Sequence, residues 1–366
     1  SSTTAVYFDN VKVPLENLLG EAGRGHIIAF NILNIGRLKL GAGALGGAKR
    51  VLAICLKYAQ ERKAFGSVIA QFGAIQHKLA EMAIRIFAVE SMVWRVVGLI
   101  QTQMQHSAQE APAHSARELK AIEEYAAECS MIKVYASEML DYVVDEGVQI
   151  HGGYGYHQDY AVEAAYRDAR VNRIFEGTNE INRLVISGFL LKRAMTGQLP
   201  LMSTIKKLMD EVLSGSQSEI AEGLLPEERK LVAAAKKIGL FAAGIATQKY
   251  MQAIQDQQEI MGAIANMTIE MYAMESAVLR AQKLAACHGE TDAAHATAMA
   301  RVYIASAMEK IESVARMVIA ATAEGDMLRS QMAILRRLAK YEPFNTIALR
   351  EKIAQKVIEG GKYQVI

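Results

Sequence analysis

A helical periodicity runs through almost the whole chain and limits its fold more than any other feature. From about Gly25 onward, apolar residues recur with the 3.6-residue period of amphipathic helices. The pattern predicts a mostly α fold, with four or five helices of an up-down bundle and then three or four further helices from Pro226 onward. Glycines and prolines divide the period into these segments, at Gly66, Pro112, Gly152 to Gly155, Gly177, Pro200, Pro226, Gly289 and Pro343.

The composition excludes several classes of protein. The 366 residues are 51% hydrophobic with a formal net charge of only +2, which is typical of a water-soluble protein with a large core and does not favour nucleic-acid binding. No apolar run is long enough to span a bilayer. Cys55, Cys129 and Cys287 lie far apart without metal-ligand spacing, so we expect buried thiols in a reducing compartment. His151 and His157 have no third ligand at a suitable spacing, so no metal site is expected.

The first residues differ from the rest. Residues 4–13 are rich in β-branched and aromatic side chains around an Asp9-Asn10 turn, a pattern that favours short β-strands. Two short strands bury too little surface to be stable alone, so we expect residues 1–24 to end a sheet whose other strands are encoded upstream. The chain would then be the C-terminal part of a longer protein. The expected domains are residues 1–24, a helical bundle at 25–197 and an additional helical domain at 198–366.

One polar stretch, residues 167–184, separates two apolar helical segments. Within it, Gly177-Thr178-Asn179 supplies a flexible turn and a side chain that can cap the next helix. Glu176 lies at the mouth of this turn, directly after Phe175. A partly desolvated carboxylate among positive charges can have its pKa tuned toward the working pH, as a general base requires. The alternative is a surface carboxylate that forms only ion pairs and a helix-dipole contact. The flanking positive charges are Arg170, Arg173 and Arg183.

The residues upstream of this stretch carry a family resemblance. Gln149-Ile150-His151-Gly152-Gly153-Tyr154-Gly155-Tyr156 forms a glycine cluster, and Glu163 and Arg167-Asp168 follow it. Together with the Phe-Glu-Gly-Thr-Asn turn, this combination resembles the acyl-CoA dehydrogenase family. The resemblance implies that Glu176 is the catalytic base, which removes the α-proton of an acyl-CoA while the β-hydrogen leaves as hydride to FAD. It also implies that the neighbours of the base, Phe175 and Gly177, contact the substrate.

Two further segments are similar to cofactor-binding segments of that family. In Arg62-Lys63-Ala64-Phe65-Gly66, the resemblance assigns the arginine to the FAD pyrophosphate, which suits the guanidinium fork, and Phe65 to the adenine end. It likewise implies that Phe72, Gln149, Gly152 and Gly153 bind FAD. The two glycines suit this role because they allow the backbone to approach the cofactor closely. In the family both segments serve the FAD of the neighbouring subunit, so a homodimer is expected. The segment expected to meet the same subunit's FAD is Thr178, Asn179 and Glu180.

Two residues in the first long helical segment align with the part of the family that lines the acyl-CoA channel. They are Asn34 and Arg37, and Arg37 is the cationic candidate. Just after them, Gly41-Ala42-Gly43-Ala44-Leu45-Gly46 matches the dinucleotide fingerprint literally, but it lies in a helical period with no βαβ unit around it. We therefore expect these small residues to let two helices approach closely.

The region after residue 197 resembles the additional C-terminal helical domain of the very-long-chain branch of the family and of a related complex I assembly factor. In that branch the extension takes the place of the second dimer of a tetramer, which again implies a homodimer. An apolar stripe over residues 201–213, with Lys206 and Lys207 on another face, allows either a weak peripheral membrane contact or packing on the chain's own bundle.

The resemblance thus implies an FAD-dependent dehydrogenation of long or very-long-chain acyl-CoA to trans-2-enoyl-CoA, the first step of fatty acid β-oxidation, with an electron-transfer flavoprotein as the electron acceptor. The alternatives are a non-catalytic assembly or scaffold protein on the same fold, and an acyl-CoA oxidase. The enzyme would be cytoplasmic in a bacterium, and in the mitochondrial matrix or at the inner membrane in a eukaryote. Flavin in this family lies between a β-domain and the α-bundle, so we expect this chain alone to be folded, nearly free of FAD and inactive.

Overall fold

The computed structural model describes residues 4–106, 114–198, 204 and 223–366, which are mostly helical, as predicted. The helices and strands of the first part are α1 (Gly25–Glu61), β1 (Lys63–Ala64), β2 (Ser67–Val68), α2 (Gly73–His106), α3 (His114–Glu124), α4 (Ala126–His151), α5 (Ala161–Ala169) and α6 (Asn179–Met195). The short 3₁₀ helices that accompany them are η1 (Leu15–Asn17), η2 (Ile69–Gln71), η4 (Gly152–Tyr156) and η5 (Arg170–Arg173).

The second part contains one helix more than the sequence analysis predicted. Its elements are α8 (Pro226–Tyr250), η6 (Met251–Asp256), α9 (Gln258–His288), α10 (Ala294–Thr322), α11 (Gly325–Leu338) and α12 (Thr346–Gly360). The unpredicted break separates α10 from α11 at Gly325, whose φ is +59°, without help from a proline. The apolar stripe at residues 201–213 lies outside the described residues, apart from position 204. The domain boundary proposed nearby stays a prediction.

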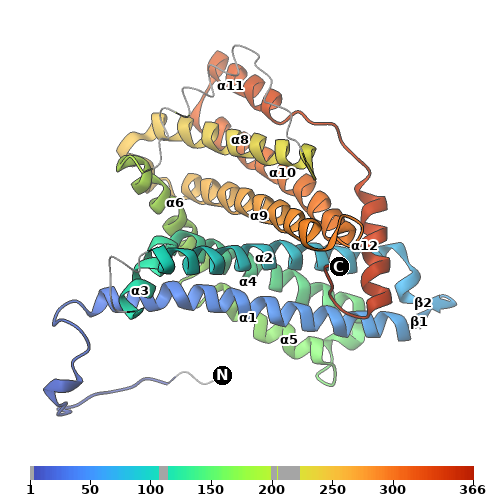
Figure 1. Ribbon diagram of the computed structural model, residues 1–366, viewed down its shortest axis with the longest axis horizontal. Coiled ribbons are helices and arrows are strands. Elements are labelled where there is room, and N and C mark those ends of the chain that lie inside the picture. The colour runs from blue at the N-terminus through green and yellow to red at the C-terminus, as the bar shows by residue number, and fades with distance from the viewer. Residues whose placement is uncertain (1–3, 107–113, 199–203, 205–222) are drawn as a thin grey trace.

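The long helices are stacked in layers (Figure 1). α1 packs along α4, and α2 packs on both of them. α9 packs on α2, and α8 and α10 pack on α9. α12 runs across one end of the layers and packs on α2 and α10, near the β1–β2 hairpin. One apolar core continues through the layers. Its fully buried side chains include Leu52, Phe87, Ile132, Ile186 and Ile238.

The small-residue motif lies inside α1, where it serves packing. A Cβ atom added to Gly41 would overlap the side chain of Ile132 on α4, so glycine allows the two helices to approach closely here. Gly43 and Gly46 would meet nothing within 4 Å. The expected close approach therefore holds at Gly41 and does not require the other two glycines.

The first residues do not form the expected strand. Residues 4–14 pair with no other strand among the described residues, and the segment extends away from the bundle (Figure 1). Val6, Tyr7 and Phe8 are 71–89% exposed. A strand needs a hydrogen-bonded neighbour, and within the described residues none is available to this segment.

Two expectations about composition need correction. Residues 226–256 are long and apolar enough to span a membrane by length and composition alone, with a mean hydropathy of 1.2, although α8 packs against α9 and α10. Cys55 and Cys129 are buried as predicted, and burial raises the pKa of each thiol to about 12. Cys287 is exposed near the end of α9, so that part of the prediction was wrong.

Candidate active site

The turn that carries Glu176 joins η5 to α6 and has an unusual backbone. Glu176 has a φ of +59° and Gly177 a φ of +80°, so two consecutive residues adopt the left-handed conformation. Glycine does so at little cost, whereas a glutamate is strained there. The Thr178 hydroxyl accepts a 3.3 Å hydrogen bond from the Ile181 amide and caps α6, as predicted. We call residues 175–178 the base turn.

Buried donors hold the carbonyl groups of the base turn. The Glu176 carbonyl accepts hydrogen bonds from Arg37 Nε at 3.2 Å and from Asn182 Nδ2 at 3.3 Å. The Gly177 carbonyl accepts from Lys133 Nζ at 2.7 Å and from Asn182 Nδ2 at 2.8 Å. Because both carbonyls are held toward the interior, the surroundings maintain the left-handed backbone at Glu176.

The carboxylate of Glu176 lies against α1 at Gly36. A Cβ atom added to Gly36 would lie 2.7 Å from Oε2 and 3.0 Å from Oε1 of Glu176. Oε2 is buried and has no hydrogen-bond partner among the described residues. An unpaired carboxylate oxygen in a dry position can accept a proton, which is the property expected of a general base.

The arginines that flank the base turn in sequence are directed elsewhere. Arg173 pairs with Asp141 at 3.0 Å, and Arg183 pairs with Glu138 at 2.7 Å. Arg170 is exposed on η5. The cations that hold the turn are instead Arg37 and Lys133, which come from α1 and α4.

Asn34 and Arg37 form a buried pair beneath the base turn. Arg37 is 8% exposed, and its Nη1 donates to Asn34 Oδ1 at 3.0 Å and to Ser130 Oγ at 3.3 Å. Burial lowers the pKa of Arg37, while the nearby Glu176 and Cys129 raise it. Arg37 thus contacts the base turn directly, and Asn34 contacts Arg37. Phe175, in contrast, is 46% exposed at the outer edge of the turn.

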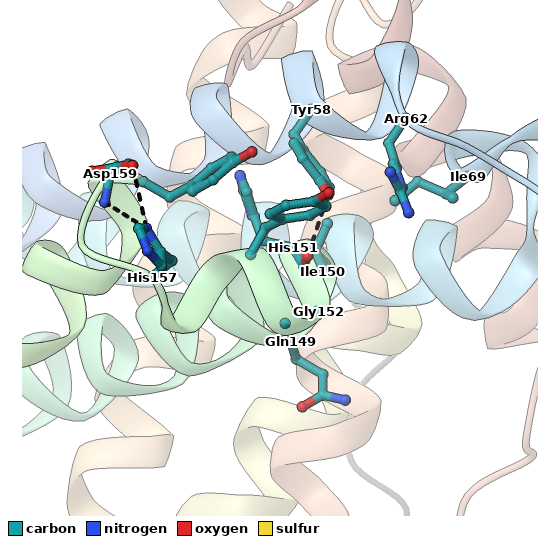
Figure 2. Close-up of a pocket in the computed structure, with 12 residues that line it drawn as sticks. Tyr58, Arg62, Ile69, Gln149, Ile150, His151, Gly152, His157 and Asp159 are labelled. Carbon is teal, nitrogen blue, oxygen red and sulfur yellow. Dashed lines mark hydrogen bonds and ion pairs between the residues drawn. The ribbon is translucent and has the colours of Figure 1, made fainter.

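A second group of predicted residues lines a cavity of about 720 Å³ between the ends of α1 and α4. Figure 2 shows Tyr58 and Arg62 extending from α1 toward the turn after α4. An added Cβ at Gly152 or Gly153 would meet nothing within 4 Å, so this backbone is open to approach. The cavity therefore unites four predicted cofactor residues: Arg62, Gln149, Gly152 and Gly153.

Aromatic rings that the sequence analysis did not select make up much of the cavity wall. Tyr58 stacks on His151 with ring centroids 4.0 Å apart, and its hydroxyl donates to the His151 carbonyl at 3.2 Å. Arg62 lies over the Tyr154 ring at 5.5 Å. Burial lowers the pKa of His151, against the opposing effect of its hydrogen bond to the Gly147 carbonyl. Tyr58 lies in the last turn of α1, four residues before Arg62, the residue that directly follows the helix, and this spacing could have revealed it.

Two predicted aromatic residues lie away from this cavity. Phe65 is 98% exposed at the tip of the β1–β2 hairpin, with a φ of +50°. Its ring meets Phe72 edge-on at 6.2 Å, and neither residue lines the cavity. Within a single chain, Phe65 therefore has little to contact.

The predicted cofactor residues form two groups, one beside the N-terminal half of α1 and one at its C-terminal end. Arg37 marks the base turn and Tyr58 marks the cavity, and 21 residues of helix between them span about 30 Å. Asn179, beside the base turn, is only 2% exposed and bonds inward to Lys133 and Glu138, so its side chain is not free for a cofactor. Glu180 remains exposed.

Comparison with known proteins finds two matching family models and several relatives of this chain. Two family models, both described as "Acyl-CoA dehydrogenase, C-terminal domain", match residues 23–191 and 234–337. A probable acyl-CoA dehydrogenase of Bacillus subtilis (strain 168) is 47% identical over 365 residues, which is 100% of this chain and 61% of that protein. The mitochondrial very long-chain specific acyl-CoA dehydrogenase of Rattus norvegicus is 33% identical over 77% of this chain and 43% of its own length.

A solved structure agrees with these matches. The acyl-CoA dehydrogenase of Bacillus anthracis, complexed with FAD, superposes with a TM-score of 0.93 at 47% identity. The match covers 96% of this chain and 60% of that protein, so the chain spans less than two thirds of the length of these relatives. Both family models, the sequence relatives and the shared structure lead to one conclusion: the chain belongs to the acyl-CoA dehydrogenase family.

Proposed function

We propose that this chain carries the catalytic base and part of the cofactor site of an FAD-dependent acyl-CoA dehydrogenase. The observation that carries the proposal is Glu176. Its backbone is held in a strained conformation, and its carboxylate has a buried, unpartnered oxygen beside Gly36. Strain that buried donors maintain is typical of functional sites.

In the proposed reaction, Glu176 removes the α-proton of an acyl thioester. Its backbone N–H donates to the thioester oxygen, which stabilises the enolate charge as it develops. Arg37 and Asn182 keep the Glu176 carbonyl inward and so orient the residue. FAD, when bound, would accept the β-hydrogen as hydride.

The cavity at the far end of α1 suits the phosphate part of FAD. Arg62 supplies paired donors for phosphate oxygens, and Gly152 and Gly153 leave the backbone open. The residues that mark the two sites, Tyr58 at this cavity and Arg37 at the base turn, are separated by about 30 Å of α1. We therefore propose a homodimer in which each cofactor is shared by the cavity of one copy and the base turn of the other.

We further propose a long or very-long-chain acyl-CoA as the substrate, in the first step of β-oxidation, and an electron-transfer flavoprotein as the electron acceptor. The rat relative named as very long-chain specific supports the substrate class, because its match covers 77% of this chain. A weak membrane contact and a cytoplasmic or mitochondrial location stay predictions.

The test is Glu176→Gln in the full-length protein. We expect FAD content and acyl-CoA binding to be retained, while turnover with palmitoyl-CoA falls by several orders of magnitude, because a neutral amide cannot remove the α-proton. The measurement is flavin bleaching under nitrogen. Glu227→Gln, which alters a surface ion pair with Lys230, is the control and should behave as wild type.

Two results would contradict the proposal. More than about a tenth of wild-type turnover in Glu176→Gln at saturating substrate would remove Glu176 from its role. Absence of bleaching in the wild type would favour the scaffold alternative, and rapid reoxidation of the wild type on admitting air would favour the oxidase.

A further inference from the structure

Lys133 is a fully buried lysine whose environment is unusual. It lies in the middle of α4, its relative exposure is 0%, and its ammonium meets neutral oxygens. Nζ donates to the Gly177 carbonyl and to Asn179 Oδ1, both at 2.7 Å. Burial of a charged group is costly unless hydrogen bonds compensate it, so these two acceptors account for its tolerance in the core.

The electrostatic surroundings of Lys133 are balanced. Burial, together with the positive charge of Arg37, lowers its pKa to about 8. Glu180, Glu138 and Glu176 act in the opposite direction and favour the charged form. The ammonium is therefore held between a second buried cation and the carboxylates around the base turn.

The side chain of Asn179, which accepts a hydrogen bond from Lys133, is held by a series of contacts that reaches α9. Asn179 donates to Glu138 Oε1 at 3.1 Å, and Glu138 accepts two hydrogen bonds from Arg183 at 2.7 and 2.9 Å. Arg183 Nε then donates to Asn266 Oδ1 on α9 at 2.7 Å. A continuous series of polar contacts thus extends from α9 to the carbonyl beside the catalytic base.

We propose that Lys133 is a positioning residue, which holds the Gly177 carbonyl inward and so sets the direction of the Glu176 carboxylate and backbone N–H. This inference rests on the proposed function of Glu176. In this proposal, Lys133 does not contact the substrate. Its contribution is to keep the strained base turn in one conformation before the substrate arrives.

The test is Lys133→Met in the full-length protein, read by two independent measurements. Amide hydrogen exchange, followed by mass spectrometry on peptides that cover residues 174–182, should become faster, because the Gly177 carbonyl loses its ammonium donor. Turnover of acyl-CoA should fall by about 10-fold to 100-fold while KM changes by less than about twofold, because misplacement of the base affects the chemical step. FAD content should remain at the wild-type level.

The control is Lys78→Met, which removes a partly buried lysine that pairs with Glu146 between α2 and α4. It should leave both exchange at residues 174–182 and turnover unchanged. If Lys133→Met does not fold, Lys133→Leu, which also lacks a donor group, is used in the same assays. Wild-type exchange and turnover in the variant that folds would overturn the proposal.

The two measurements separate this inference from the proposed function. An inactive wild-type protein whose Lys133 variant shows faster exchange only around the base turn would refute the dehydrogenase while supporting the positioning role. A variant that loses FAD and exchanges faster throughout the bundle would show a general structural role and overturn the inference.

Discussion

The base turn and the proposed cofactor cavity differ in how far one chain completes them. At the base turn, the carbonyls of Glu176 and Gly177 are met by buried donors from α1, α4 and α6. At the cavity, the lining residues His157 and Asp159 have side chains that are 61% and 75% exposed. The proposed base is therefore organised within this chain, whereas the proposed cofactor site is open on one side. A base must be oriented before the reaction, while a cofactor site can be assembled on binding.

Among changes that leave Glu176 in place, the largest effect should come from a side chain that overlaps its carboxylate. In Gly36→Ala, the new Cβ would lie 2.7 Å from Glu176 Oε2, so the carboxylate must move. We expect turnover in the full-length protein to fall by about 100-fold, because a displacement near 1 Å has that cost. Gly43→Ala, whose Cβ would meet nothing within 4 Å, is the control on the same helix. Equal turnover in both variants would mean that the base turn is not as tightly organised as the comparison requires.

A smaller effect is expected at the cavity. Arg62→Gln removes the guanidinium from the proposed phosphate position, and FAD affinity in the full-length protein should weaken by about 10-fold to 100-fold, the range for a charge-assisted hydrogen bond. Fluorescence titration of the apoprotein with FAD measures this. Arg329→Gln, in an exposed pair with Asp326, should change nothing. Unchanged affinity in Arg62→Gln would exclude the cavity from cofactor binding.

The smallest effect should come from the contact that links α9 to the base turn. Asn266→Ala removes the acceptor of Arg183 Nε, and the free energy of unfolding should fall by about 1 kcal/mol. Chemical denaturation of this chain provides the measurement, with Asn10→Ala at an exposed position as the control. Identical stability of the two variants would show that the second helical part does not support the base turn through this contact.

Much of the site could be predicted where the relevant groups are neighbours in sequence. Gly177 and Thr178 indicated a turn and a helix cap, and the glycine cluster at 152–155 indicated an open backbone. The charges around Glu176 could not be predicted in this way. Arg173 and Arg183 lie close to it in sequence but pair with Asp141 and Glu138, because the helical path turns them toward α4.

Lys133 is a charged residue whose neighbours in the sequence do not explain its position. It is an isolated charge in the run Met131-Ile132-Lys133-Val134-Tyr135, which otherwise reads as core. Such a residue must have buried acceptors, but the sequence does not say which. The structure provides them at Gly177, 44 residues away, and at Asn179, 46 residues away.

The sequence by itself determined the helices and the local chemistry of the base turn, because apolar period, glycine breaks and capping side chains act over a few residues. Only the tertiary structure decided which cations hold that turn and how far apart the two groups of predicted cofactor residues lie. Arg37 reaches Glu176 across 139 residues because α1 packs along α4 and α4 packs on α6. The length of α1 then separates Arg62 from the base by a distance that no local pattern encodes.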